Sequence, residues 1–341
     1  MANPDGGEAD FASLANHVID QASETDDDSA VGVDSEAVST ISLPNFDYVT
    51  ENGRTYHIHD RGICILPNDP REMKRLDDMH KIWVSTLDGE ISLCRESDTR
   101  RQRILDLGTG NGVWAIAYAD AYPTAQVIGV DITPTQDTWV PPNVQFEIDD
   151  MEKEWTWKRK FDFVFGRDLM GSVQDWAALL RCILDNLNPG GWVEIQDYGY
   201  PHHEGTESPP TKLSEWLQEM VRASRALRQP IDMIEQLADL MEKEGFTEIR
   251  CVKKRVPLDN SSKNESLNQI GKSAAALFEA HLEGISMIRF KHGLGYTIKE
   301  VLDYLSALRT ELKNNHIPAY FEVHVIYGRK PVQGLVSKEP L

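Results

Sequence analysis

Arg103-Ile-Leu-Asp-Leu-Gly-Thr-Gly-Asn-Gly112 decides the fold class of this chain of 341 residues. An apolar run leads into a glycine-rich turn, and a second apolar run, Val127-Ile-Gly-Val-Asp131, follows after one helix and ends in an acid. This order is typical of one half of a nucleotide-binding α/β sheet, in which the ligand lies across the carboxyl ends of the strands. The glycines let a ligand approach the backbone closely, and the following helix points its N-terminal amides toward that ligand.

Two acids indicate which ligand this turn binds. Asp106 lies two residues before Gly108, where a dinucleotide would place its pyrophosphate, and a carboxylate there repels phosphate. The same carboxylate suits the ammonium group of a methionine moiety, and Asp131 lies near the distance along the chain at which an acid accepts ribose hydroxyls. We therefore predict a site for S-adenosylmethionine and disfavour a dinucleotide oxidoreductase. Its predicted residues are Asp106, Gly108, Thr109, Gly110, Gly112, Asp131 and Ile132.

The charge of the chain is concentrated at its beginning. The formal net charge is −20, and residues 1–40 hold ten acids and neither lysine nor arginine. This composition predicts a disordered acidic tail over 1–44, which is either a solvated spacer or a docking segment for a protein partner. The remainder has no concentrated basic face and no apolar run of membrane-spanning length, so neither nucleic acid nor a membrane is expected as a partner.

The cysteines and the N-terminal residues allow a prediction of the cellular compartment of the protein. The four cysteines are scattered without a Cys-x-x-Cys pair, which argues against a zinc site and a disulfide framework, and no metal is expected. The first residues have no basic group and no apolar core, so no secretory signal is expected. The prediction is a cytoplasmic protein, or a nuclear one if the chain is a regulator.

Local patterns predict the organisation of the chain. We expect a subdomain over about 45–95, a main domain over 96–330 and a short tail over 331–341. In the subdomain, Asn52-Gly53 predicts the turn of a hairpin over 48–58, because both residues accept positive φ angles. Asp69-Pro-Arg-Glu72 predicts the start of a helix, with an acidic cap followed by proline in the first turn.

Apolar runs and helical patterns alternate in the main domain, which is typical of a parallel sheet. Helices are expected to begin near Gly112 and Gln174. Helical insertions, about 205–245 and 260–316, either cap a substrate cavity or pack against the sheet. Strands are expected near 103–107, 126–131, 144–148, 161–166, 192–197, 247–252 and 320–327.

These motifs resemble those of the class I S-adenosylmethionine-dependent methyltransferases, and more closely the fungal LaeA-like methyltransferases of secondary metabolism. The resemblance covers about residues 48–200. It implies an α/β, Rossmann-like fold, with a seven-stranded mixed sheet whose last strand inserts antiparallel, helices on both faces, and N-terminal and C-terminal helical additions. The broad class is carried by Asp106-Leu-Gly-Thr-Gly-Asn-Gly112, Val130-Asp131 and Asn188-Pro-Gly-Gly191. The closer family is carried by Glu51-Asn-Gly-Arg-Thr-Tyr-His57, Leu66-Pro-Asn-Asp69, Trp139-Val-Pro-Pro-Asn-Val144, Gly166-Arg-Asp-Leu-Met-Gly-Ser172 and Gly191-Trp-Val-Glu-Ile-Gln-Asp197.

The resemblance extends the predicted donor site beyond the glycine-rich turn. It implies an acid on the adenine amine after the third strand, either Asp149 or Asp150, with Met151 packed on the ring. The alternative is a solvated acidic loop, since Glu152 and Glu154 follow. Two further pairs of residues have alternative interpretations. Arg167 and Asp168 either line the donor pocket or pair with each other. His80 and Tyr56 either wall the pocket from the N-terminal side or are core residues.

The acceptor side is predicted from the stretch after the fifth strand. A hydroxyl or amine acceptor that must lose a proton benefits from a base within hydrogen-bond reach. Asp197, Tyr198, His202 and His203 lie in this stretch, which we interpret as a loop, and are the candidate catalytic residues. An acidic enol or a carboxylic acid needs no base at all.

Two functions follow as hypotheses. The first is an enzyme that methylates an oxygen or a nitrogen of a small molecule, in a fungal secondary-metabolite pathway. The second is a nuclear regulator of secondary metabolism with the same fold, for which the acidic tail would bind a protein partner.

Overall fold

The computed structural model describes residues 47–59, 62–94, 102–136, 139–203, 211–258, 262, 264–314 and 319–332. The acidic tail predicted over 1–44 lies outside these residues, as does most of the tail predicted over 331–341. All elements below belong to the unit Phe46–Leu341. No helix in this described part is both long and apolar enough to cross a membrane.

Within the described residues, one mixed sheet contains the strands β4 (Arg103–Leu107), β5 (Gln126–Asp131), β6 (Val144–Ile148), β7 (Phe161–Arg167), β8 (Leu187–His203), β9 (Thr247–Pro257) and β10 (Ala319–Arg329). Their order is β6-β5-β4-β7-β8-β10-β9. Strands β4 to β8 are parallel, whereas β10 pairs antiparallel with both β8 and β9. The predicted Rossmann-like sheet with an antiparallel last strand is therefore confirmed.

Strand β8 is longer than its sequence predicts. The prediction ended the strand near 197 and placed His202 and His203 in a loop, which is wrong. The partner strand β10 continues alongside, with Tyr320 opposite His202 and Ala319 opposite His203. Because β10 is more than a hundred residues away along the chain, the local sequence gives no sign of this extension.

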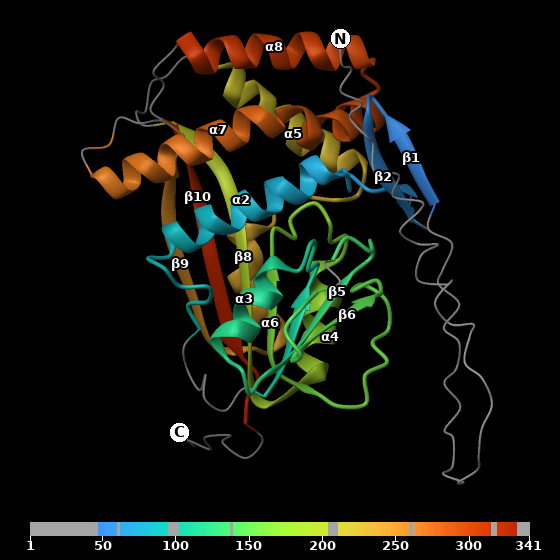
Figure 1. Ribbon diagram of the computed structural model, residues 1–341, viewed down its shortest axis with the longest axis vertical. Coiled ribbons are helices and arrows are strands. Elements are labelled where there is room, and N and C mark those ends of the chain that lie inside the picture. Colours follow the sequence, from blue (N-terminus) through green and yellow to red (C-terminus); the bar gives the residue numbers. More distant parts are fainter. Residues whose placement is uncertain are drawn as a thin grey trace, which may run out of the picture. The chain divides into compact units, whose positions relative to one another are not determined.

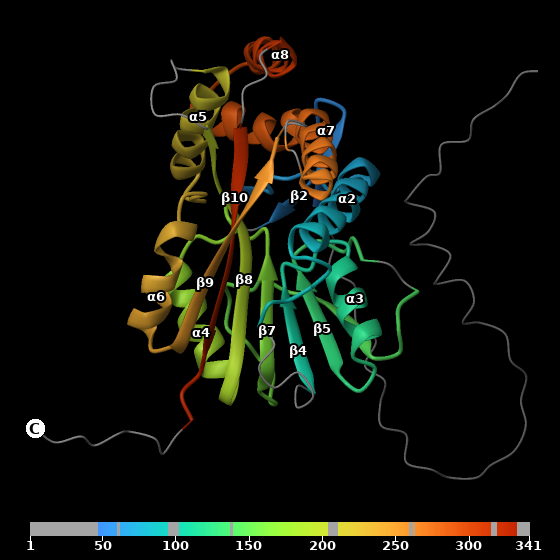
Figure 2. The ribbon, with the colours of Figure 1, turned by 90° about the vertical axis from the view of Figure 1, so that its left-hand side faces the viewer.

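Side chains of the sheet alternate between its two faces, as the period of a strand requires. On one face, Ile104 packs with Trp114 of helix α3 (Val113–Ala121). On the other, Leu105 packs with helices α4 (Trp176–Asn186) and α6 (Leu237–Glu244). Figure 2 shows α3 on one side of the strands and α4 and α6 on the other. The sheet is thereby covered on both faces, which leaves the carboxyl ends of its strands for the site.

A layer of helices covers those carboxyl ends. It consists of α2 (Pro70–Thr86), α5 (Lys212–Ala226), α7 (Glu265–Ile288) and α8 (Ile298–Asn314), with the π-helical turn η3 (Arg289–Gly293) after α7. Figures 1 and 2 show these helices above the sheet, with α2 and α7 side by side. The helical insertions thus behave in two ways: α6, which follows the 3-10 turn η2 (Ile234–Gln236), packs against the sheet, and the others form the layer.

The N-terminal strands form a separate small sheet within the described residues: β1 (Asp47–Glu51), β2 (Arg54–His59) and β3 (Gly62–Ile63). The predicted hairpin is confirmed, since β1 pairs with β2 and the turn residues Asn52 and Gly53 have φ angles of 51° and 71°. The predicted helix start is confirmed as well, because the side chain of Asp69 accepts the backbone N–H of Glu72 at 3.0 Å.

Buried ion pairs hold the first turn of α2. Arg54 of β2 forms a bidentate pair with Asp69, and Arg75 Nε lies 2.7 Å from Glu72 Oε1. Arg54 and Arg75 are each at most 6% exposed. Since a buried charge is costly without a partner, these pairs fix the position of α2 over the sheet.

Candidate active site

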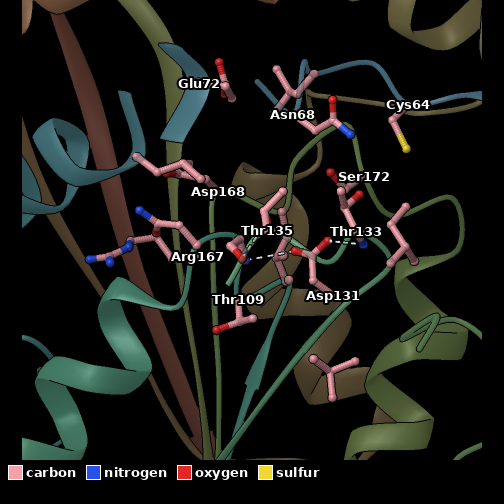
Figure 3. A pocket seen from close by; sticks show the side chains of 18 of the residues that line it. Cys64, Asn68, Glu72, Thr109, Asp131, Thr133, Thr135, Arg167, Asp168 and Ser172 are labelled. Atoms are coloured by element: carbon pink, nitrogen blue, oxygen red, sulfur yellow. Dashed lines mark hydrogen bonds between the residues drawn. The ribbon is translucent and has the colours of Figure 1, made fainter. Parts of the chain in front are cut away.

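A cavity lies over the carboxyl ends of β4, β5 and β7, with α2 as its outer wall. We call it the turn cavity, because the glycine-rich turn forms its floor. Figure 3 shows Asp131 and Thr133 on one side of it and Arg167 and Asp168 on the other. Its lining includes the predicted residues Asp106, Gly108, Thr109, Gly110, Asp131, Ile132, Asp149, Asp150, Met151, Arg167, Asp168 and His80.

The glycine-rich turn needs glycine for two reasons. Gly108, Gly110 and Gly112 all have positive φ angles, of 62°, 58° and 82°. A β-carbon on Gly112 would also lie 2.2 Å from Cζ of Phe146, which is a severe overlap. Gly112 is the N-cap residue of α3 and is not among the described residues that line the cavity. It therefore shapes the turn from outside the pocket.

Asp131 holds the turn by its backbone. One carboxylate oxygen accepts the N–H of Gly110 at 2.9 Å, and the other accepts the N–H of Thr133 at 2.9 Å. The carbonyl of Gly110 accepts hydrogen bonds from Thr135 Oγ1 at 3.0 Å and Gln136 Nε2 at 2.7 Å. Both backbone groups of Gly110 are thus hydrogen-bonded within the protein, which fixes the shape of the turn without a ligand.

Two acids of the turn cavity, Asp106 and Asp131, are ionised only at a cost in free energy. Asp106 is 2% exposed and accepts a hydrogen bond from Thr109 Oγ1 at 2.6 Å. Burial raises the pKa of Asp106 to about 7, an effect that the charge of Arg167 opposes, and burial raises the pKa of Asp131 to about 6. A cation bound between these carboxylates would relieve that cost. The cavity therefore fits the positively charged methionine end of an adenosyl sulfonium.

Arg167 and Asp168 end β7 on the far wall. Arg167 Nη2 lies 2.8 Å from His80 Nδ1, and burial together with the charge of Arg167 lowers the pKa of His80 to about 4. The neutral imidazole therefore accepts this hydrogen bond. Asp168 accepts the indole N–H of Trp83 at 3.4 Å and has a φ angle of 56°, which is rare for a residue with a side chain. The two side chains form no direct salt bridge with each other, although the charge of each favours the charged form of the other.

The other predicted donor residues divide between wall and core. Asp150 is 6% exposed and accepts the N–H of Glu152 at 3.0 Å, whereas Asp149 is exposed at the rim. Both line the turn cavity, as does Met151. Tyr56 is fully buried beside Ile65 and outside the described lining of the turn cavity. Its position is that of a core residue.

A second cavity adjoins the turn cavity beneath the helical layer. We call it the apolar cavity, after most of its side chains. Its wall is shared with the turn cavity at Leu66, Arg75, Met79 and Asp168. It is lined by Leu66, Arg75, Met79, Ile82, Asp168, Met170, Asp197, Tyr198, Gly199, Trp216, Leu217, Met220, Ile231, Val256, Ala274, Leu277, Phe278, His281, Ile285, Arg289 and Phe321.

Of the candidate catalytic residues, Asp197 and Tyr198 line the apolar cavity. The Tyr198 hydroxyl donates to Met79 Sδ at 2.8 Å, and Asp197 accepts the N–H groups of Met170 and Tyr198, both at 2.8 Å. Burial raises the pKa of Tyr198 well above its usual value, and burial with the nearby Asp168 raises that of Asp197. The side chains of His202 and His203 lie outside the described residues.

Two arginines of the apolar cavity were missed by the sequence analysis. Arg75 lies on α2, and Arg289 begins η3. A signal for Arg289 exists, because it follows Leu282 by seven positions and Ile285 by four, on the apolar stripe of α7. A charge at such a position is either paired inside the protein or directed at a ligand.

The relatives of this chain include methyltransferases and regulators of secondary metabolism. A family model described as a methyltransferase domain matches residues 80–260. The methyltransferase pytC of Aspergillus terreus is 32% identical over 293 residues, which cover 85% of this chain and 90% of that protein. The secondary metabolism regulator laeA of Aspergillus flavus is 30% identical over 289 residues, covering 83% and 78%. The protein-methionine methyltransferase laeA of Emericella nidulans is 31% identical over 291 residues, covering 83% and 76%.

The topology of the sheet and the relatives of this chain indicate the same family. The described residues contain the mixed sheet expected from the resemblance, with its last strand antiparallel and with the glycine-rich turn and its two acids at the carboxyl ends of the strands. The family model covers more than half of the chain, and similarity to pytC and laeA continues through most of the remainder. This chain therefore belongs to the LaeA-like class I methyltransferases, which take the methyl group from S-adenosylmethionine.

Proposed function

We propose that this methyltransferase transfers a methyl group to an oxygen or a nitrogen of a small molecule in a fungal secondary-metabolite pathway. The observation that carries the proposal is the pair of cavities that meet at Leu66, Arg75, Met79 and Asp168. The turn cavity contains acids and the glycine-rich turn, and the apolar cavity has an apolar lining beneath a layer of helices. A small acceptor enclosed there would face the donor across the shared wall.

Transfer from a sulfonium is an in-line displacement, so S-adenosylmethionine supplies an activated methyl group and the protein supplies position and dryness. Asp106 and the backbone of Gly108 would hold the methionine end, in a turn whose shape Gly110 fixes through its own hydrogen bonds. Asp131 would accept the ribose hydroxyls, and Asp149 or Asp150 would accept the adenine amine, with Met151 against the ring. Arg167 and His80 would close the pocket opposite Asp131.

Whether the acceptor must lose a proton decides whether the apolar cavity needs a base. Tyr198 keeps its proton at neutral pH because burial raises its pKa, so it would act as a hydrogen-bond donor that orients the acceptor. Asp197 is likewise biased toward its neutral form. Under the proposed function, His202 and His203 stay as candidate bases at the end of β8.

Donor affinity is expected to weaken as the pH falls from about 8 to about 5.5. Burial raises the pKa of Asp106 to about 7 and that of Asp131 to about 6, so both carboxylates lose their charge across this range. If only the ionised form of one carboxylate binds the cation, affinity falls roughly tenfold for each pH unit below its pKa. Isothermal titration calorimetry of S-adenosylmethionine at several pH values measures the change.

Asp106→Asn is the control for this pH dependence. Its donor affinity should be lower at about pH 8 and should vary less with pH. In the protein without donor, the stability is expected to change with pH in the opposite direction to the donor affinity. A carboxyl with a raised pKa in the folded state lowers stability as the pH rises from about 4, its unfolded value, to about 7, so the variant should gain stability over the native protein in that window. Donor affinity that is constant from about pH 8 to about pH 5.5 would contradict the assignment of these acids.

The alternative function is that of a nuclear regulator, and the 30% identity to laeA of Aspergillus flavus favours keeping it. Deleting residues 1–44 separates the two. The small-molecule enzyme is expected to retain donor binding and turnover, because every residue of both cavities lies after residue 46. A regulator that docks through this tail would lose its partner in a pull-down. Retained partner binding together with lost turnover would contradict both expectations.

A further inference from the structure

Arg289 is a buried cation in the apolar cavity. Its side chain is at the first position of the π-helical turn η3, and the residue is 4% exposed. Its Nε donates to Ser224 Oγ at 3.1 Å, and its Nη1 donates to the carbonyl of Ile285 at 2.7 Å. In the described part of the chain, no carboxylate lies within salt-bridge distance of this guanidinium. Burial and the charge of Arg75 lower the pKa of Arg289 to about 10, so the group is still charged at neutral pH.

The other buried arginines of the described residues differ from it. Arg54 is paired with Asp69, and Arg75 is paired with Glu72. Among the described residues, each buried guanidinium on α2 and β2 thus has a carboxylate within salt-bridge distance, whereas Arg289 has none so close and interacts with the charge of Glu72 only at longer range. An isolated buried charge is strongly unfavourable, and π-helical turns occur frequently at functional sites. Arg289 thus has the properties of a group that awaits an anionic ligand.

The position of the guanidinium places such a ligand next to the donor. A β-carbon on Gly171 would lie 2.7 Å from Arg289 Nη2, so the guanidinium lies against the backbone of Gly171. The residue before it, Met170, lines the apolar cavity, and the residue after it, Ser172, lines the turn cavity. Arg289 is therefore at the boundary between the two cavities.

The rest of the apolar cavity fits an apolar body. Trp216 and Met220 of α5, Leu277 and Phe278 of α7, and Phe321 of β10 contribute hydrophobic surface to it. Such a lining binds hydrocarbon or aromatic groups, and a single charged group fixes their orientation. The ligand that matches this lining has one acidic end and an apolar remainder.

A groove between α2 and α7 adjoins the apolar cavity at Ile82, Leu277 and His281. The charged residues of the groove are Arg71, Lys74, Lys81 and Asp78, of which Lys74 and Lys81 both contact Asp78. Cations thus outnumber acids in this groove, although the chain as a whole carries a formal net charge of −20. Excess positive charge beside the apolar cavity attracts an anionic acceptor and repels a cationic one.

We propose that the acceptor is an apolar small molecule with an anionic oxygen, either a carboxylate or an ionised enol, and that Arg289 binds this oxygen beside the donor. The proposal rests on the proposed function and specifies its acceptor. A lone pair of the oxygen forms the new bond to the methyl carbon while the carbon–sulfur bond breaks and its electron pair stays on sulfur. No proton moves, which agrees with the protonated state of Tyr198 and with the lack of need for a base.

The first test uses the free protein and the variant Arg289→Met. If the guanidinium serves a ligand, its replacement by an apolar side chain of similar length should leave the melting temperature unchanged or raise it, and should leave donor affinity unchanged. If the guanidinium serves the fold, the melting temperature should fall by several degrees. The second outcome would overturn the proposal without any knowledge of the acceptor.

The second test supplies deuteromethyl-labelled S-adenosylmethionine with aromatic and aliphatic carboxylic acids, acidic enols, and amides, alcohols and amines of matched size. The native protein should methylate acids or enols in preference to their neutral partners. Arg289→Met should lose this activity by about a hundredfold and Arg289→Lys by about tenfold, since lysine keeps the charge but not the bidentate geometry. Alkaline hydrolysis releases labelled methanol from a methyl ester and not from an enol ether, which identifies the source of the oxygen.

The outcomes distinguish this proposal from the proposed function. A native protein that binds no donor would refute both. Methylation of amines or neutral alcohols at a rate equal to that of the acids would refute the anionic acceptor alone, as would unchanged acid methylation by Arg289→Met. If the donor binds and no acid or enol is methylated, the result also counts against the anionic acceptor.

Discussion

Gly112→Ala is expected to abolish donor binding and to lower the melting temperature. The φ angle of 82° would cost an alanine about 1 kcal/mol, and its β-carbon would lie 2.2 Å from Cζ of Phe146. Relief of that overlap requires the turn, α3 or β6 to shift, at a further cost of about 1–3 kcal/mol. Because Gly112 caps α3, the shift would also displace the helix N-terminus that faces the donor. Thermal unfolding and calorimetric titration of the donor measure both effects.

Gly53→Ala is the matched control. Gly53 has a similar φ angle of 71°, but a β-carbon there would meet no atom within 4 Å. It should therefore show only the conformational cost, about 1 kcal/mol, with donor affinity unchanged. If both variants lose the same stability and Gly112→Ala still binds the donor, then close packing behind the turn is not what requires glycine.

Asp131→Ala is expected to have the largest effect on the donor alone. The variant removes the acceptor of the Gly110 and Thr133 N–H groups, and with it the proposed acceptor of the ribose hydroxyls. Hydrogen bonds to a charged group contribute about 1.5–3 kcal/mol each, so the loss of two to the ribose should weaken binding at least a hundredfold. The fold should survive, because Asp131 lies at the end of β5 and not within its packed length.

Asp131→Asn separates the ribose contact from the support of the turn. Its side-chain oxygen can still accept one of the two N–H groups, while its amide cannot accept the other. Donor affinity between that of the native protein and that of Asp131→Ala is therefore expected in calorimetry. If both variants bind the donor with native affinity, Asp131 does not bind the ribose. A circular dichroism spectrum of each variant checks that the fold is intact.

The sequence predicted those parts of the fold that short-range chemistry determines. The run from Ile104 to Leu107 is apolar except for Asp106, and both of its faces are buried against helices, so its strand lies where the pattern indicates. The start of α2 follows from the acid and proline that cap it, and the hairpin turn follows from Asn52-Gly53. In each case the cause lies within a few residues of the effect.

Long-range packing decided what the sequence could not show. The length of β8 depends on pairing with β10, and the burial of Tyr56 depends on Ile288, which is more than 200 residues later. The apolar cavity combines side chains from between Leu66 and Phe321, so no local pattern marks it. For Arg289, the local pattern shows a charge on an apolar stripe, but only the structure shows that no carboxylate of the described residues lies within salt-bridge distance of it.

Helix α2 has a consequence for how the ligands influence each other. Met79 faces the turn cavity and the apolar cavity, and Ile82 faces the apolar cavity and the groove. A single helix is thus a partition with a ligand space on more than one side. A molecule that restrains this partition from one side reduces the entropy lost by a molecule binding on the other. By thermodynamic reciprocity, each then raises the affinity for the other by the same factor, so the ternary complex is favoured over either binary one.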